Sequence, residues 1–280
     1  MRRSSATVVA GLVTATAAFC EPSVERGEYL AEGLAGCGNC HTPIGPEGPV
    51  MEMNLAGRLV EDIEPFRAVA PNITPGGRVA GWSDAELARA IREGIRPDGS
   101  VIGPPMPSRF YRGLSDEDLA SIVMYLRTVP AVANDPGESE YRIPLPPAWG
   151  PPVESVAQPD ESDPVAYGEY LAGPVAHCME CHSTPGPMGA MLDTHLGAGG
   201  WEFHGPWGVS VSANLTPHPE DGIVSWTDAE LVQMITQGVR PGGAPMLPPM
   251  GYGYYARATS GDLAAIVAYL RSLPALPDPM

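Results

Sequence analysis

Apolar side chains recur every three or four positions in two stretches of the chain, which predicts two amphipathic helices. The first stretch begins after Ser115 and ends before Pro130, and the second begins after Thr259 and ends before Pro274. A proline just beyond the last apolar position is typical of a helix end. The apolar faces consist of Leu119, Ile122, Val123 and Leu126 in the first stretch and Leu263, Ile266, Val267 and Leu270 in the second.

Four further helices are predicted from capping signals at their first residues. A hydroxyl residue stands three positions before a glutamate at Ser83–Glu86 and again at Thr227–Glu230, the pattern of a capping box. The other two helices are predicted to begin near Ser23 and at Asp163. At the second of these starts an aspartate at the N-cap precedes a proline, Pro164. No convincing alternation of apolar and polar residues indicates a strand. We therefore expect an all-α fold with long loops.

The predicted helices belong to two copies of one sequence pattern. A block at residues 27–31 recurs at 168–172, and later blocks recur in the same order at almost the same offset. Such a period predicts a tandem duplication, with one domain in residues 21–130 and the other in residues 164–280. Residues 131–163 are rich in proline and acidic residues, which predicts an extended, semi-rigid linker. The later blocks are Asn72–Pro75 with Asn214–Pro217, Trp82–Leu87 with Trp226–Leu231, and Pro104–Met106 with Pro248–Met250.

The N-terminal segment, residues 1–20, has the features of an export signal. Arg2 and Arg3 precede a short, mildly apolar stretch, and the small residues Ala15 and Ala17 offer a cleavage site. We interpret this segment as a signal peptide and expect a periplasmic protein. Cys20 raises the alternative of a lipid anchor, although Phe19 is a poor fit to that processing. No other segment is long and apolar enough for a transmembrane helix, so we expect none in the mature chain.

Charge and composition narrow the function further. The chain has 16 Lys+Arg residues, all of them arginine, against 33 Asp+Glu, a formal net charge of −17. Because so acidic a chain repels phosphate backbones, we exclude nucleic acid as a partner. It also contains 33 glycines and 33 prolines but only 7% aromatic residues. A chain so rich in loop-forming residues needs a metal, a disulfide or a large cofactor to support its core.

Each repeat contains the motif Cys-x-x-Cys-His, the attachment signature of c-type haem. It occurs as Cys37, Cys40 and His41 and again as Cys178, Cys181 and His182. The two thiols of such a motif bind haem covalently, and the histidine beneath supplies an iron ligand. A redox disulfide or half of a zinc site is the alternative. However, no βαβ context is present, and the two motifs lie far apart in the sequence, in separate repeats. We therefore predict two covalently bound haem c groups.

The sixth iron ligand is predicted to be a methionine in each repeat. Met106 and Met250 occupy the same Pro-Pro-Met frame just before the last helix, where prolines stiffen the loop. Met246 is the competitor of Met250, but in the repeat alignment it falls on Ile102. A pair of histidine ligands is the other alternative, since four histidines lie outside the motifs: His177, His195, His204 and His218. Tyr111 and Tyr255 also recur at one register, and we expect them to line the haem sites.

The order of these motifs resembles that of the cytochrome c subunits of membrane-bound bacterial alcohol, aldehyde, gluconate and fructose dehydrogenases. The likeness covers both repeats and lies in C-x-x-C-H, P-N-(I/L)-T-P, W-(S/T)-D-A-E-L, P-P-M and D-L-A-x-I-V-x-Y-L-R. The resemblance implies a class I cytochrome c fold in each repeat and electron transfer outside the cytoplasmic membrane. Those subunits usually carry three haems and often a C-terminal membrane segment, and this chain has two haem motifs and no such segment.

These observations favour a dihaem electron carrier over an enzyme. It would pass electrons from a dehydrogenase or quinol-linked donor to a respiratory acceptor, such as another cytochrome or an oxidase. The alternatives are a dihaem peroxidase, which needs an open iron, a thiosulfate-oxidising cytochrome, which uses a cysteine ligand, and a haem-based sensor. Neither half of the chain is cationic. We therefore expect that a redox partner is basic or makes apolar contact around the haem edges.

Overall fold

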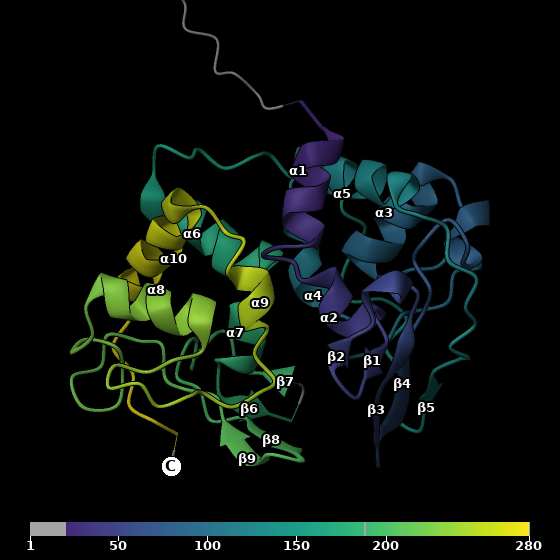
Figure 1. The fold of residues 1–280 in the computed structure, drawn as a ribbon. Helices are drawn as coiled ribbons and strands as arrows, with labels where there is room; N and C mark the ends of the chain where they lie inside the picture. Colours follow the sequence, from purple (N-terminus) through teal and green to yellow (C-terminus); the bar gives the residue numbers. More distant parts are fainter. Residues whose placement is uncertain (1–20, 188, 280) are drawn as a thin grey trace, which may run out of the picture.

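The computed structural model describes residues 21–187 and 189–279 and arranges them as two repeats side by side (Figure 1). The predicted signal peptide and Cys20 lie outside the described residues. Within the described ranges, no helix combines the length and the apolar character needed to cross a membrane. In the first repeat the elements are α1 (Val24–Ala31), α2 (Cys37–His41), β1 (Ile44–Gly45), β2 (Gly48–Pro49), β3 (Arg58–Ile63), β4 (Phe66–Ala70), α3 (Asp84–Glu93), α4 (Ser108–Tyr111) and α5 (Asp116–Thr128), with 3-10 turns at Met51–Met53 and Arg78–Gly81.

The second repeat follows the same order of elements. A π-helical turn at Leu171–Val175 follows its first helix, and the linker between the repeats contributes the short strand β5 (Glu140–Tyr141). The elements are α6 (Pro164–Tyr170), α7 (Cys178–Cys181), β6 (Pro185–Gly186), β7 (Gly189–Ala190), β8 (Glu202–Gly205), β9 (Gly208–Val211), α8 (Asp228–Gln237), α9 (Tyr252–Tyr255) and α10 (Ser260–Ser272).

The helix starts predicted from capping signals are confirmed. The side chains of Ser23 and Asp163 accept hydrogen bonds from the backbone of the first turns of α1 and α6. Both capping boxes form, at the start of α3 and of α8. Ser115 and Thr259 cap α5 and α10, whose predicted apolar faces are buried. Local chemistry at the N-cap therefore fixes where six of the helices begin.

The prediction of an all-α fold is wrong. Only 35% of the residues are helical, and 13% lie in strands that form several small sheets. A three-stranded sheet has the order β3-β4-β5, and β8 pairs with β9 in a hairpin. These strands lack the alternation that would reveal them, because Leu59 and Ile63 on β3 are exposed and a bulge lies between Leu59 and Glu61.

The segment 131–163 runs along the first repeat and bonds to it at several points. Residues of β5 pair with β4, and the indole of Trp149 donates to the carbonyl of Ile102 at 2.8 Å. Farther along, the carboxylate of Asp116 accepts hydrogen bonds from Ser155 and from the backbone of Val156. The segment therefore covers one sheet edge and one end of the first repeat.

The first and last helices of each repeat cross at a glycine. A Cβ atom at Gly27 would lie 1.9 Å from the carbonyl oxygen of Ser121 on α5, and one at Gly168 would lie 1.9 Å from that of Ala265 on α10. Only a residue without a side chain allows helices to approach so closely. These crossings carry the core, in which Leu30 and Leu171 are fully buried.

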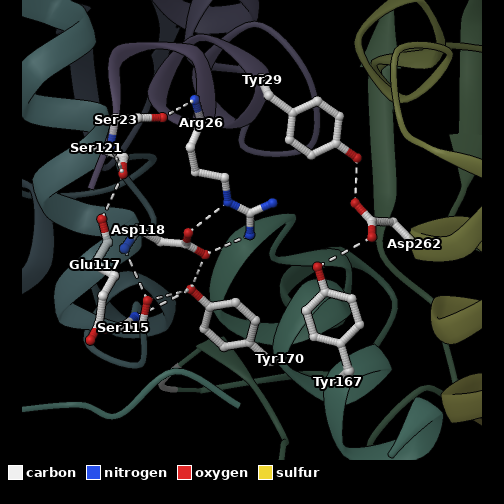
Figure 2. Close-up of polar contacts among 10 residues, drawn as sticks. All are labelled: Ser23, Arg26, Tyr29, Ser115, Glu117, Asp118, Ser121, Tyr167, Tyr170 and Asp262. Carbon is white, nitrogen blue, oxygen red and sulfur yellow. Dashed lines mark hydrogen bonds and ion pairs between the residues drawn. The ribbon is translucent and has the colours of Figure 1, made fainter. Parts of the chain in front are cut away.

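Two buried aspartates, one in each repeat, join the repeats, because each is hydrogen-bonded to a tyrosine of the other repeat (Figure 2). Tyr170 of the second repeat donates to Asp118 of the first at 2.6 Å, and Tyr29 of the first donates to Asp262 of the second. The same hydroxyls accept hydrogen bonds from the backbone N–H groups of Ser115 and Thr259, respectively. Tyr170 and Tyr29 thus make equivalent contacts: each donates to an aspartate and accepts from a backbone N–H group of the other repeat.

The remaining partner of each aspartate differs between the repeats. Arg26 binds both carboxylate oxygens of Asp118, at 2.7 and 2.9 Å. The residue at the same register in the second repeat is Tyr167, which donates to Asp262 at 3.2 Å. One aspartate is therefore neutralised by a cation, whereas among the described residues the carboxylate of the other accepts hydrogen bonds from two tyrosine hydroxyls and pairs with no cation. Burial and the neighbouring Asp262 carboxylate raise the pKa of Tyr29 to about 12, so its hydroxyl stays protonated and donates.

Tyr170→Phe should lower the free energy of unfolding by about 1.5–3 kcal/mol, because it removes a hydrogen bond to a buried charge. Guanidinium unfolding would measure the loss. Tyr252→Phe is the matched control, since the hydroxyl of Tyr252 donates to an exposed carbonyl of its own loop. Equal effects of the two substitutions would show that the aspartate contact contributes nothing.

Candidate haem sites

The structure places the four motif cysteines on two short, corresponding helices. Cys37 and Cys40 lie on α2, and Cys178 and Cys181 lie on α7. All four thiols are free and half-buried. Burial raises the pKa of Cys37, Cys178 and Cys181 to about 12, so these thiols are protonated and uncharged at neutral pH. Each helix thus presents a pair of neutral thiols separated by two residues.

Both motif histidines are oriented by a backbone carbonyl. The Nδ1 atom of His41 lies 2.8 Å from the carbonyl oxygen of Pro71, and that of His182 lies 2.8 Å from that of Ala213. A carbonyl only accepts, so Nδ1 carries the proton and Nε2 keeps its lone pair. Burial also lowers the pKa of both imidazoles, which favours the neutral form that binds a metal.

A recurring Asn-x-Thr turn holds each of these carbonyls in place. The side chain of Asn214 accepts from the backbone and the hydroxyl of Thr216 and donates to the carbonyl of Leu276. Asn72 and Thr74 make the same contacts in the first repeat, with Val132 as the acceptor. The block is visible in the sequence as a repeat, but its role beside the histidine is not. The only indication in the sequence was that an asparagine and a threonine, both uncharged, recur at the same two positions of the repeats.

The predicted methionine ligands occupy equivalent loops that lead into α4 and α9. Met106 and Met250 are half-buried, and each follows a cis proline–proline bond. The carbonyl of Met106 accepts from the backbone of Ser108, and that of Met250 accepts from Tyr252, so both loops turn directly into the helix. Met246 is also half-buried; its backbone N–H donates to the carbonyl of Gly238.

Tyr111 and Tyr255 connect each methionine loop to a thiol pair. The buried Tyr111 on α4 lies in the electrostatic field of Cys37 and Cys40, and Tyr255 on α9 in that of Cys178 and Cys181. Burial first, and then these neighbours, raise the pKa of both phenols well above the ordinary value. Each tyrosine therefore lies close to one thiol pair, and its place beside a haem stays a prediction.

The two sites lie next to each other across the boundary between the repeats. Tyr255 in the second site also interacts electrostatically with Cys40 in the first. The ring of Tyr111 packs edge-on against His177, with 5.8 Å between the ring centroids. In Figure 1, α2 and α7 accordingly both lie toward the middle of the molecule. The motifs stand in different halves of the chain, so their proximity is not apparent from the sequence.

The charges around the two sites differ. Glu32 is buried in the first repeat, where its carboxylate accepts from Asn54 at 2.8 Å and from Tyr125 at 2.9 Å. After burial itself, its charge is the next cause of the raised pKa of Cys37. Its counterpart in the second repeat is Gly173, so the second site has no such carboxylate. The second site instead has Glu180 between its own cysteines.

The four other histidines each have a partner of their own. His177 lies 3.2 Å from Glu180, and the Nδ1 of His195 lies 2.9 Å from the hydroxyl of Thr194. His204 and His218 approach the carboxylates Glu202 and Asp221, each at 3.4 Å. None of these four histidines lies in the Pro-Pro-Met loop of either repeat.

The donor set fits a covalently bound haem in both repeats. Each site combines two free thiols, one neutral imidazole with a free Nε2 and a thioether on a neighbouring loop. Soft sulfur and imidazole donors are those that hold haem iron in cytochromes c.

The chain is similar to cytochrome c subunits over about nine-tenths of its length. It is 31% identical to the fructose dehydrogenase cytochrome subunit of Gluconobacter japonicus (91% of this chain, 53% of the relative). It is 28% identical to the cytochrome c subunit of the quinone alcohol dehydrogenase of Gluconobacter oxydans (92% and 56%), and 27% identical to a diheme cytochrome c-type protein of Cereibacter sphaeroides (90% and 86%). These similarities confirm the resemblance that the motifs indicated.

The names of these relatives describe electron-transfer components, in agreement with the prediction of an electron carrier rather than an enzyme. The chain spans about half the length of the first two relatives. No family model matches it.

Asn214→Ala should lower the free energy of unfolding by about 1–3 kcal/mol, because it leaves buried groups of the Thr216 turn without partners. Chemical denaturation would measure the change. Thr128→Ala serves as the control, since the exposed hydroxyl of Thr128 bonds only within its own helix. If both variants unfold at the wild-type denaturant concentration, the turn does not support the carbonyl beneath His182.

Proposed function

We propose that the chain is an exported dihaem cytochrome c that carries electrons and performs no chemistry on a substrate. The observation that supports this most directly is the identical histidine geometry in the two repeats. The Nδ1 atoms of His41 and His182 each lie 2.8 Å from a backbone carbonyl, that of Pro71 and that of Ala213, and these two residues stand at the same register of the repeats. A structural histidine has no need of such a duplicated constraint, whereas an iron ligand requires a fixed tautomer.

In this proposal the motif cysteines attach the haems and the repeated pairs of ligands hold the iron. Cys37 and Cys40 would attach one haem, and His41 and Met106 would hold its iron. Cys178 and Cys181 would attach the other, with its iron held by His182 and Met250. The bound haems supply a one-electron redox couple, whose potential methionine–histidine ligation raises.

The chain's own residues favour electron transfer over catalysis at these sites. The stiff Pro-Pro-Met loops would support a weak thioether ligand in each repeat, so that each iron would be held by two protein donors. A peroxidase needs one open position, and a thiosulfate-oxidising site needs a cysteine ligand in addition to the attachment pair. Each repeat has a methionine loop instead, and in this proposal the motif thiols attach the haems.

Location and partners follow from the sequence and from the names of the relatives. The features of residues 1–20 support export to the periplasm. The relatives are cytochrome subunits of fructose, alcohol and gluconate dehydrogenases, which supports a dehydrogenase or a quinol-linked protein as the electron donor. A respiratory cytochrome or oxidase would be the acceptor.

The purified protein should contain two covalently bound haems per chain, because each repeat has a complete donor set. A pyridine haemochrome assay on the denatured protein, combined with mass spectrometry, would measure the number. A value near one, or haem that acid-acetone extracts, would contradict the proposal.

Met250→Ala should remove about half of the sulfur-to-iron absorption band of the oxidised protein, because one of two thioether ligands is lost. Met246→Ala is the matched control and should leave the band unchanged, since Met246 lies at the register of Ile102. The reverse result would assign the second iron to Met246.

A further inference from the structure

A buried carboxylate distinguishes the first haem site from the second. Glu32 follows the last residue of α1, and its side chain is only 7% exposed. One of its oxygens accepts hydrogen bonds from the side-chain amide of Asn54 at 2.8 Å and from the hydroxyl of Tyr125 at 2.9 Å. The other oxygen lies 3.6 Å from the guanidinium of Arg257 in the second repeat. All three partners are donors, so the contacts match a negatively charged side chain, which only accepts.

Asn54 connects this carboxylate to the motif helix α2. Its amide oxygen accepts a hydrogen bond at 2.6 Å from the hydroxyl of Thr42, the residue that follows His41. The same oxygen would lie 3.3 Å from a Cβ atom at Gly38, which stands between the two motif cysteines. The carboxylate of Glu32 is therefore one hydrogen bond away from a side chain that touches α2.

The negative charge of Glu32 acts on the groups around the first thiol pair. Burial first, and then Glu32, raise the pKa of Cys37 to about 12. The same two causes raise the pKa of Tyr254 to about 12, and the hydroxyl of Tyr254 would lie 2.7 Å from a Cβ atom at Gly38. The charge thus lies close to the thiol that would attach the first haem.

Arg257 does not cancel this charge. Its side chain is 53% exposed, whereas that of Glu32 is almost completely buried. Water and salt screen an exposed charge much more than a buried one. At Tyr254, which both charges reach, the effect of Glu32 on the pKa is larger than the opposite effect of Arg257. The ion pair therefore leaves a net negative charge on the side of the first site.

Both members of this ion pair are glycines at the equivalent place in the second repeat. Gly173 stands at the register of Glu32, and Gly113 stands at the register of Arg257. The counterpart of Tyr125 is Tyr269, whose hydroxyl bonds to no carboxylate among the described residues. The second site thus has the tyrosine but not the buried charge.

The amide that holds the carboxylate is also missing from the second repeat. The backbone N–H of Leu55 donates to the hydroxyl of Thr42, and that of Gly197 donates to the hydroxyl of Ser183 in the same way. Leu196 therefore stands where the first repeat has Asn54, the residue before Leu55. An apolar side chain replaces the amide, which agrees with the loss of the carboxylate.

The other charges near the thiols do not separate the two sites. Burial is the first cause of the raised pKa of both Cys40 and Cys181, and Glu180 contributes to both. Arg58 and Glu61 also reach Cys40, but they shift its pKa in opposite directions. Glu32 is therefore the charge that makes the first site more negative than the second.

We propose that the buried carboxylate of Glu32 holds the reduction potential of the first haem below that of the second. The oxidised form of a haem has one more positive charge than the reduced form, so a nearby negative charge stabilises it. Electrons would then pass within the chain from the first haem, which is oxidised, to the second, which is reduced. This inference rests on the proposed function, because it requires a haem in each repeat.

A redox titration of the full, haem-loaded protein, followed by absorption and fitted with two one-electron steps, tests the proposal. The wild-type protein should show two separate potentials. Glu32→Gln removes the charge but keeps an acceptor oxygen for Asn54 and Tyr125. It should raise the lower potential, so that the equilibrium constant between the haems falls by about three- to tenfold, where tenfold is about 59 mV. Since the charge is buried, the change should persist at high salt.

Three further variants distinguish a buried charge from other effects. Glu28→Gln is the matched control, because it removes an exposed carboxylate one turn earlier on α1 and should leave both potentials unchanged. Gly173→Glu combined with Leu196→Asn places the network in the second repeat, where a Cβ atom at Gly173 meets no atom within 4 Å. This pair should lower the higher potential. Gly173→Gln with Leu196→Asn has the same shape without the charge and should leave it unchanged.

Several results would overturn the role of Glu32. They are equal potentials of the two haems in the wild-type protein, an unchanged or wider gap in Glu32→Gln, and an equal effect of Glu28→Gln. If the variants of the second repeat fail to fold, the comparison of Glu32→Gln with Glu28→Gln decides alone. Haem content of the same samples separates this proposal from the proposed function. Fewer than two haems contradicts the function, whereas two haems with an unchanged gap in Glu32→Gln contradicts only the role of Glu32.

Discussion

Two buried carboxylates, Asp118 and Asp262, constrain the arrangement of the whole molecule. A buried charge must have partners, because removing it from water is costly. Each aspartate finds one partner in the first turn of α1 or α6 of its own repeat and another in a tyrosine hydroxyl of the other repeat. The repeats therefore have to lie side by side with α1 and α6 at their boundary. This placement brings α2 and α7, and with them the two candidate haem sites, next to each other.

Features that depend on neighbouring residues were predictable from the sequence. The capping residues Ser83 and Thr227 act within one turn, so their patterns indicated helix starts that the structure confirms. The repeat itself showed that Tyr111 and Tyr255 have equivalent places. The candidate ligands His41 and His182 also stood out, because their motif is a run of five residues.

Features that depend on distant partners were not predictable. Tyr29 recurs within a repeated block, but its partner Asp262 lies in the other half of the chain, and nothing near either residue indicates the pairing. The sequence pattern did not indicate the hairpins, because their apolar side chains, such as Leu59 and Val211, are exposed and do not face the core. A pattern reveals a strand only where one face is buried. The all-α expectation was wrong for this reason.

The exchange of tyrosines has a consequence for how such a chain could arise. Each half gives the other the same contact that it receives, which is the defining property of an interface with twofold symmetry between identical subunits. Two separate copies of one repeat could have made these contacts as a homodimer before the genes were fused. The segment 131–163 would then have replaced a concentration-dependent association by an intramolecular one. Arg26 and Tyr167, which stand at the same register, are the point at which the two halves of this symmetric arrangement differ.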